Sequence, residues 1–453
     1  MARVLVVSAE PLGPLVAGPS IRALELARAL SGRHEVTIAA PGLTDSAITG
    51  VGALDAGFED YERLTEAIGR AQVVVAQALP ARVLGSLPSS GARLVADLYN
   101  PTVFEILEAG REKGLSARRR QQREVTLTAG AMVAAASRVM CASESQRDLW
   151  LGFMAALGRI PVGAYDADPT FRSFVDVVPF GVPDEPPGPA STDPIRAMFP
   201  GIGPGDAVAL WGGGVWNWLD PQAAIDAVGL LDAGGGDGRK VHLVFMGLGR
   251  PSGEDLDAMA ATVDMERHLA ATGLEGRCVH VNRGWVPYAQ RGGWLAASDI
   301  ALSAHRDHLE SRLAFRTRLV DAIWGRLPIV ATSGDAIAAE VESRAMGRTC
   351  PPGDPEALAN AIGTLVDDET AMTAARESLG EAAAALSWSR CARPLEEWCD
   401  HPDGGLGPDR GLLRRMTLAR YPGIVAETVE TDGAPAAARR IWTNARRAVR
   451  RGR

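Results

Sequence analysis

The residues best suited to chemistry lie in one short stretch of the second half of the chain. Glu310 lies in a polar loop, Arg316 and Arg318 flank Thr317, and Asp321 follows four residues later on the Thr317 side of a predicted helix. Carboxylates accept hydrogen bonds from sugar or ribose hydroxyls, and guanidinium groups bind diphosphate in bidentate fashion. These residue types predict a site for a nucleotide or sugar ligand. A local surface pair between Arg318 and Asp321 is the alternative.

A glycine-rich turn ends the predicted strand at Ala207–Trp211, in the sequence LWGGGVWNWLD. Three consecutive glycines allow the backbone to approach a ligand closely and to donate N–H groups. The aromatic ring and the amide that follow could stack on and bind a sugar or a base. The candidates are therefore Gly212, Gly213, Gly214, Trp216 and Asn217, unless the segment is a flexible turn whose tryptophans close the core.

Two other glycine-containing turns also follow predicted strands. Arg250 ends the turn MGLGR, where it could pair with a phosphate. Near the start of the chain, Gly18 opens a predicted helix and Arg22 lies in its first turn. A helix start of this kind offers free backbone N–H groups to an anion. A plain strand-to-helix turn is the alternative.

The elements that must position these residues form two series of strands alternating with helices. Such alternation predicts two doubly wound α/β domains with parallel sheets, whose ligands bind beyond the carboxyl ends of the strands. The predicted strands are Arg3–Ser8, His34–Ala39, Ala71–Ala76, Arg93–Leu98, Arg138–Ala142 and Val175–Phe180, then Ala207–Trp211, Val241–Met246, Arg277–Val281, Asp299–Ala304 and Leu327–Thr332.

A proline-rich run, DEPPGPASTDP, separates the two series and predicts an interdomain linker. We therefore expect a first domain at residues 1–183, a linker at 184–204, a second domain at 205–390 and a helical extension at 391–453. The extension ends in a strongly basic segment, Arg439–Arg453. This segment is either a terminal helix packed on a domain or an interfacial helix attracted to anionic lipid.

Composition limits the function classes. The net charge is −8 over 453 residues, which argues against nucleic acid as a partner. The five cysteines lack CxxC spacing, which suits a reducing compartment, and a zinc site built from Cys391, Cys399 and His401 is a weak alternative to having no metal. No apolar run approaches the ~20 residues of a membrane span. We expect a cytoplasmic protein, with possible contact at the inner face of the membrane through its basic tail.

Three segments resemble the GT-B glycosyltransferases, and in particular family 4 of the retaining nucleotide-sugar transferases. The first is AGPSIRALELARALSGRHEVTIAAPG, which resembles that family's opening strand, loop and helix. The others are VVPFGV, before the linker, and LVDAIWGRLPIVATSGD, which resembles the donor-site helix and the strand after it. The similarity spans most of residues 1–370. It implies two Rossmann-like domains that face each other across a cleft.

The resemblance also implies roles for individual residues. The family has two glutamates eight positions apart, one near the donor sugar and one on the ribose. The second falls on Asp321, but the first falls on Leu313, so Glu310 is the expected replacement. The family's diphosphate-binding Arg and Lys are missing near Gly212, and Arg316, Arg318 or Arg250 would supply that charge. Phe315 and Thr317 complete the expected donor site.

On the acceptor side, the resemblance points to the first domain. The candidates are Asp97, Asn100 and Glu105, after a predicted strand, together with Gly18 and Arg22. Asp97 and Glu310 are the candidate catalytic residues. The reaction is expected to need no metal and no cofactor, and to retain the configuration of the anomeric carbon.

The sequence thus predicts a transferase that moves a sugar from a nucleoside-diphosphate sugar to a hydroxyl or another nucleophile of a small-molecule, glycan or lipid-linked acceptor. Two alternatives remain. One is a catalytically silent GT-B protein that regulates a partner, suggested by the missing first glutamate. The other is a nucleotide-sugar epimerase on the same fold, which would convert the donor without an acceptor.

Overall fold

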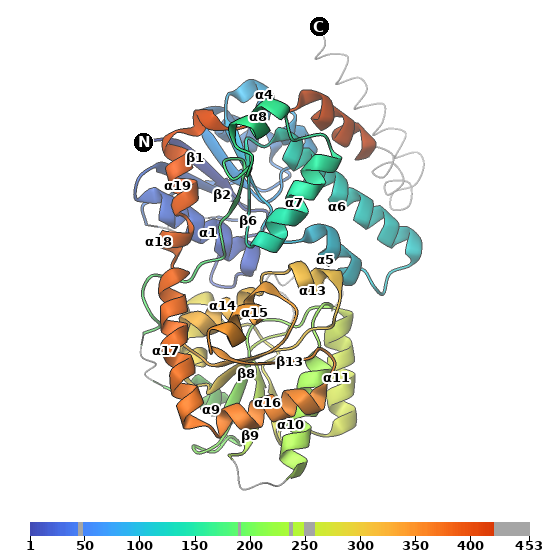
Figure 1. The fold of residues 1–453 in the computed structure, drawn as a ribbon, viewed down its shortest axis with the longest axis vertical. Helices are drawn as coiled ribbons and strands as arrows, with labels where there is room; N and C mark the ends of the chain where they lie inside the picture. The colour runs from blue at the N-terminus through green and yellow to red at the C-terminus, as the bar shows by residue number, and fades with distance from the viewer. Residues whose placement is uncertain (44–48, 189–191, 235–238, 249–258, 421–453) are drawn as a thin grey trace.

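The computed structural model describes residues 1–43, 49–188, 192–234, 239–248 and 259–420. The chain forms two α/β units stacked along the long axis of the molecule (Figure 1). Each unit contains a parallel sheet with helices packed against it. The predicted fold class, two Rossmann-like doubly wound domains, is confirmed.

The first unit contains a seven-stranded parallel sheet of order β3-β2-β1-β4-β5-β6-β7. Most of its strands are buried along their length, as expected where helices cover both faces of a parallel sheet. The strands are β1 (Arg3–Val7), β2 (Glu35–Ala40), β3 (Gly52–Asp55), β4 (Val73–Ala76), β5 (Arg93–Asp97), β6 (Arg138–Cys141) and β7 (Val175–Val177). The helices are α1 (Gly18–Ser31), α2 (Tyr61–Arg70), α3 (Ala81–Leu84), α4 (Leu87–Ser90), α5 (Thr102–Ala109), α6 (Leu115–Ala135), α7 (Glu144–Ala156) and α8 (Val162–Ala167).

The second unit contains a six-stranded parallel sheet of order β10-β9-β8-β11-β12-β13. Its strands are β8 (Ala207–Trp211), β9 (Val241–Phe245), β10 (Val279–Val281), β11 (Ile300–Ser303), β12 (Ile329–Thr332) and β13 (Gly347–Cys350). Its helices are α9 (Pro194–Met198), α10 (Pro221–Gly234), α11 (Ala260–Thr272), α12 (Arg291–Ala296), α13 (Leu309–Leu313), α14 (Thr317–Trp324), α15 (Ala336–Ser343), α16 (Pro355–Val366) and α17 (Glu369–Ala385).

Two edge strands, β3 and β13, were not predicted, because neither has an apolar run. Strand β3 reads GALD and strand β13 reads GRTC. In β13 the glycine is required by the pairing: Gly347 has φ +155°, and a Cβ there would lie 1.8 Å from the Ile329 carbonyl oxygen. Edge strands of this kind are defined by their backbone pairing rather than by a hydrophobic pattern.

The segment His305–Ser311, predicted as a polar loop, contains the start of a short helix. Helix α13 spans Leu309–Leu313, and the side chain of His308 caps it by accepting from the Ser311 N–H. The helix predicted from Phe315 begins at Thr317. Sequence rules search for Ser, Thr, Asp or Asn at a helix start, so a histidine cap gives no signal.

The chain crosses between the two units twice. After α17, helices α18 (Trp388–Cys391) and α19 (Arg393–Asp400) return to the first unit, where the Trp388 ring lies 5.2 Å from that of Phe180. The Leu406 N–H donates to the Ser137 carbonyl, and a further helix at 410–420 packs its Met416 near Gly130 of α6. Part of the segment 391–453 therefore packs on the first unit, and the basic tail lies outside the described residues.

The described residues contain no helix with the length and apolarity needed to cross a bilayer.

A buried histidine pair lies in the second unit, away from the carboxyl ends of its strands. His242 Nδ1 lies 2.9 Å from His280 Nε2, and His242 Nε2 lies 3.0 Å from Asp206 Oδ2. Both rings are buried. Burial, with a smaller contribution from His242, lowers the pKa of His280 to about 4, and burial also lowers the pKa of His242. Both rings are therefore neutral at pH 7 in the folded chain.

This pair predicts a loss of stability in mild acid. Unfolded His280 takes up a proton below pH about 6.5, whereas the folded residue does so only near pH 4, so stability is complete above 6.5 and falls as the pH drops toward 4. When the pH is lowered from 7.5 to 5, we expect His280 to reduce the unfolding free energy by about 1–2 kcal/mol. Urea titrations of the wild type and His280→Asn at both pH values measure this difference. Parallel pH dependence of the two proteins would contradict it.

Candidate functional site

The order of the second sheet determines where its ligand site must lie. Strand order reverses between β8 and β11, which are neighbours, so their following loops emerge side by side at the carboxyl edge. The Asp220 N–H donates to the Ala304 carbonyl at 2.9 Å, which joins the two loops directly. The glycine-rich turn and the loop leading to α14 therefore lie together at this edge, and the ligand site predicted there stays a prediction.

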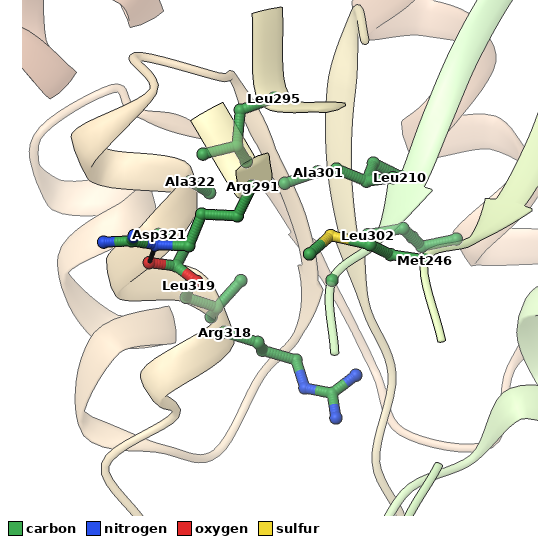
Figure 2. Close-up of a pocket in the computed structure, with 11 residues that line it drawn as sticks. Leu210, Met246, Arg291, Leu295, Ala301, Leu302, Arg318, Leu319, Asp321 and Ala322 are labelled. Carbon is green, nitrogen blue, oxygen red and sulfur yellow. Dashed lines mark hydrogen bonds and ion pairs between the residues drawn. The ribbon is translucent and has the colours of Figure 1, made fainter. Parts of the chain in front are cut away.

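A pocket lies between these elements (Figure 2). Three predicted donor residues line it: Gly212, Arg318 and Asp321. Apolar side chains from β8, β11, α12 and α14, together with Met246 directly after β9, form much of the remaining wall, and Arg291 from α12 contributes a second cation. The lining combines apolar surface with a few polar groups.

Arg318 is a shielded cation in this pocket without an ion-pair partner among the described residues. Its Nη2 donates to the Gly214 carbonyl at 2.8 Å, and its guanidinium lies 5.0 Å from the centre of the Trp211 ring. Its Nη1 is shielded from solvent and has no hydrogen-bond partner within residues 1–43, 49–188, 192–234, 239–248 and 259–420. Burial, together with the charge of Arg316, lowers the pKa of Arg318 to about 9. An anion beside Nη1 would relieve the cost of this buried charge.

Glu310 and Arg316 bind each other rather than facing open space. Arg316 donates from Nη1 and Nη2 to the two carboxylate oxygens of Glu310, both at 2.9 Å, and from Nη2 to Ser311 Oγ at 3.0 Å. The two residues are 2% and 5% exposed. The expected contacts, of Glu310 with the donor sugar and of Arg316 with the diphosphate, stay predictions. Either contact would require the ion pair between the two residues to break.

A second carboxylate lies behind this pair. Asp335 caps α15 by accepting from two backbone N–H groups, and its other oxygen lies 3.8 Å from Arg316 Nε and 3.4 Å from His305 Nε2. His305 and Asp335 are both buried. The loop before α14 is therefore attached to α15 by the Arg316–Asp335 ion pair and to β12 by the His305 N–H, which donates to Thr332 Oγ1 at 3.0 Å.

The glycine-rich turn itself lies at the junction of the two units. Gly213 has φ +76°, a conformation that favours glycine. Asn217, predicted to contact the donor, instead donates to the Glu108 and Ala109 carbonyls of α5 and accepts from the Ala261 N–H. Trp216 stacks on Trp218, with ring centres 5.9 Å apart. The amide of Asn217 therefore joins the units, and its role toward a ligand stays a prediction.

The predicted acceptor residues Asp97 and Arg22 form a buried ion pair. Arg22 donates to both Asp97 oxygens at 2.7 and 2.9 Å, and also to the Val178 and Pro179 carbonyls. Its guanidinium lies 4.8 Å from the Tyr99 ring centre. Burial raises the pKa of Asp97, although the Arg22 charge opposes this effect. This pair fixes α1 against the ends of β5 and β7, so neither group is free for an acceptor in this arrangement.

The remaining predicted residues are spread around the cleft. Gly18 faces Thr317 across the two units, since a Cβ at Gly18 would lie 3.7 Å from Thr317 Oγ1. Asn100 is half-buried after β5, and Glu105 lies in α5. Phe315 packs partly buried against the core. Arg250 lies outside the described residues.

Sequence reasoning missed Arg291. Its Nε donates to Asp321 Oδ1 at 3.1 Å, and Asp321 keeps a side-chain exposure of 39%. Arg291 begins a short helix and belongs to no motif, so only the tertiary structure brings it to the pocket. Among the described residues, no cluster of three or more His, Cys, Asp or Glu side chains could hold a metal ion.

Comparison with known proteins agrees with this geometry. Residues 208–368 match the family model described as Glycosyl transferases group 1. No curated protein matches the sequence. Similar solved structures include HepE of Anabaena in complex with UDP and glucose, which has a TM-score of 0.61 and 15% identity over 88% of this chain and 100% of that one.

Two synthases show the same similarity of fold. The sucrose-phosphate synthase of Thermosynechococcus elongatus has a TM-score of 0.60 and 14% identity over 89% of this chain and 99% of that one. A UDP-forming trehalose-phosphate synthase of Burkholderia xenovorans has a TM-score of 0.60 and 11% identity over 88% and 99%. The chain has the GT-B fold of these structures, and residues 208–368 of its second unit match the group 1 glycosyl transferase model. Its placement in family 4 stays a prediction.

The Glu310–Arg316 pair predicts a large stability effect from a single substitution. Glu310→Ala leaves the Arg316 guanidinium buried without its main partner, so the unfolding free energy should fall by about 3 kcal/mol. Chemical denaturation at pH 7.5 measures the change. The control is Glu397→Ala, which breaks an exposed pair with Arg393 and should cost less than about 1 kcal/mol. Equal, small losses in both variants would contradict a structural role for Glu310.

Proposed function

We propose that the chain transfers a sugar from a nucleoside-diphosphate sugar to an acceptor hydroxyl or another nucleophile, with retention and without a required metal or cofactor. The observation that carries this proposal is Nη1 of Arg318, which has no hydrogen-bond partner in the described part of the chain. This atom lies beside the glycine-rich turn, at a pocket that Asp321 also lines. Retention rests on the resemblance to family 4. The nucleotide-sugar donor is also supported by HepE, whose structures are described with UDP and with UDP-glucose.

In the proposed complex, the diphosphate lies between Arg318 and the backbone of Gly212–Gly214. Negative charge develops on the diphosphate as the sugar leaves, and a fixed guanidinium with backbone N–H groups stabilises that charge. The pocket provides this cation without needing Arg316, which is bound to Glu310. Asp321 accepts from the ribose hydroxyls, and Met246 and Leu210 supply apolar surface nearby.

The acceptor enters from the first unit in this proposal. The contact between Gly18 of α1 and Thr317 of α14 marks where the two units face each other beside the donor pocket. Because Asp97 is paired with Arg22, the base or polar contact for the acceptor is sought among the half-buried groups beyond β5, such as Asn100. We further propose a cytoplasmic location.

Arg318 gives the sharpest test of the donor site. Arg318→Met should weaken binding of UDP, GDP, ADP or TDP, whichever binds the wild type, by about 10–100-fold, because a charge-assisted hydrogen bond contributes about 1.5–3 kcal/mol. Binding of the corresponding nucleoside, which has no phosphate, should change less than threefold. Isothermal titration calorimetry measures both affinities.

The matched control for this test is Arg312→Met, which removes an exposed arginine from the neighbouring helix α13. This variant should bind the nucleoside diphosphate as the wild type does. If the wild type binds none of the four diphosphates at millimolar concentration, the proposed donor is wrong. If Arg318→Met binds the diphosphate unchanged, the proposed phosphate contact is wrong.

We also propose peripheral contact with an anionic membrane surface. In the sequence this contact was assigned to the tail Arg439–Arg453, which lies outside the described residues. A second basic surface supports it: exposed side chains at i, i+4 and i+8 on α6, together with exposed side chains on the adjacent helix 410–420. These side chains are Leu115, Arg119 and Arg123, then Arg414, Arg415 and Leu418.

This basic surface predicts salt-sensitive binding to vesicles. Each arginine near an anionic bilayer contributes about 1 kcal/mol, so Arg119→Glu with Arg123→Glu should weaken binding to phosphatidylglycerol-containing vesicles at least tenfold. Vesicle sedimentation at low and high salt measures it, with pure phosphatidylcholine vesicles as the control. If the variant and the wild type bind the vesicles equally, the basic surface of α6 does not contact the membrane.

A further inference from the structure

Arg291 is held between two aromatic rings at the wall of the donor pocket. Its guanidinium carbon lies 3.6 Å from the centre of the Tyr288 ring and 4.3 Å from that of the Trp324 ring. Its Nη1 donates to the Tyr288 carbonyl at 2.8 Å, and its Nε donates to Asp321 Oδ1 at 3.1 Å. Figure 2 shows the Arg291 and Asp321 side chains together at the pocket wall. The rings and hydrogen bonds fix the guanidinium, and the guanidinium fixes the carboxylate.

The Tyr288 ring is attached to the first unit. The Tyr288 N–H donates to the Pro14 carbonyl at 2.9 Å, and its hydroxyl donates to Glu25 Oε1 of α1 at 3.3 Å. Burial raises the pKa of the Tyr288 hydroxyl, so it stays protonated and continues to donate. Tyr288 does not line the pocket itself, whereas Arg291 does.

The Trp324 ring is attached to the segment that joins the units. Its Nε1 donates to the Glu185 carbonyl at 2.8 Å. A Cβ at Gly292 would lie 3.2 Å from Pro187 and 3.4 Å from the Trp324 ring, so the linker packs closely here. Both rings that hold Arg291 are therefore bonded to parts of the chain outside the second sheet.

We propose that Arg291 is a positioning residue that couples the orientation of Asp321 to the contact between the two units. When the units are together, Pro14 and Glu25 hold Tyr288, Tyr288 and Trp324 hold Arg291, and Arg291 holds Asp321. When the units separate, Tyr288 loses both partners and Asp321 loses its fixed orientation. By linkage, if closure of the two units strengthens the binding of a nucleoside at Asp321 by a given factor, the bound nucleoside favours closure by the same factor. This inference rests on the proposed role of Asp321 toward the donor ribose.

The test uses substitutions that do not touch the pocket. Tyr288→Phe keeps the ring over Arg291 but removes the bond to Glu25, and Glu25→Gln alters the same bond from the other unit. Each should weaken nucleoside-diphosphate binding about three- to tenfold. Because both substitutions act on the same hydrogen bond, the affinity of the double variant should be no lower than that of the single variant with the lower affinity. Small-angle scattering should show a smaller nucleotide-induced compaction in each variant than in the wild type.

Tyr165→Phe, at an exposed tyrosine of α8, is the matched control and should leave affinity and compaction unchanged. If the wild type binds no nucleoside diphosphate, the proposed function fails and the coupling fails with it. If the wild type binds and Arg318→Met weakens binding, but Tyr288→Phe and Glu25→Gln bind and compact as the wild type does, the donor site stands and the coupling is overturned.

Discussion

The pairing of Arg316 with Glu310 decides which charges the cleft can offer to a ligand. The buried guanidinium of Arg316 donates from both Nη atoms to the carboxylate of Glu310, which compensates its positive charge. Asp335 adds a second carboxylate beside the same guanidinium. The neighbouring guanidinium of Arg318 shares none of these partners and reaches the pocket beside the glycine-rich turn. Arg316 and Arg318 lie two residues apart in the sequence but differ in their charged neighbours. Of the two, Arg318 is the one whose charge is not compensated by a carboxylate among the described residues.

The loop before α14 and the glycine-rich turn depart from the family's pattern at positions that join the two units. The resemblance expects a glutamate at the position of Leu313 and cations near Gly212, and neither is present. The Leu313 carbonyl instead accepts from Gln146 of the first unit, and Asn217 of the turn bonds to α5. The loop and the turn therefore join the two units. Their polar groups bond to the first unit at positions where the resemblance expects contacts with the donor.

Much of the fold could be predicted from the sequence, because buried parallel strands are continuous apolar runs. Edge strands such as β13 could not, since their pairing depends on the backbone and on one glycine, Gly347. The structure brings the two candidate loops together, because β8 and β11 are neighbours in the sheet, and their role as a ligand site stays a prediction. Individual roles were harder to predict: Arg22 and Asp97 are 75 residues apart, and their partnership exists only after folding. Arg291 gave no signal, since two of the residues it contacts, Asp321 and Trp324, are distant from it in sequence.

A crystal structure of the chain with a bound nucleoside diphosphate would show which arginine binds the diphosphate. We expect phosphate oxygens within about 3 Å of Arg318 Nη1 and of backbone N–H groups in the glycine-rich turn, with the ribose at Asp321 and Arg316 still paired to Glu310. A diphosphate bound by Arg316 after release from Glu310, or lying away from Arg318, would contradict this expectation.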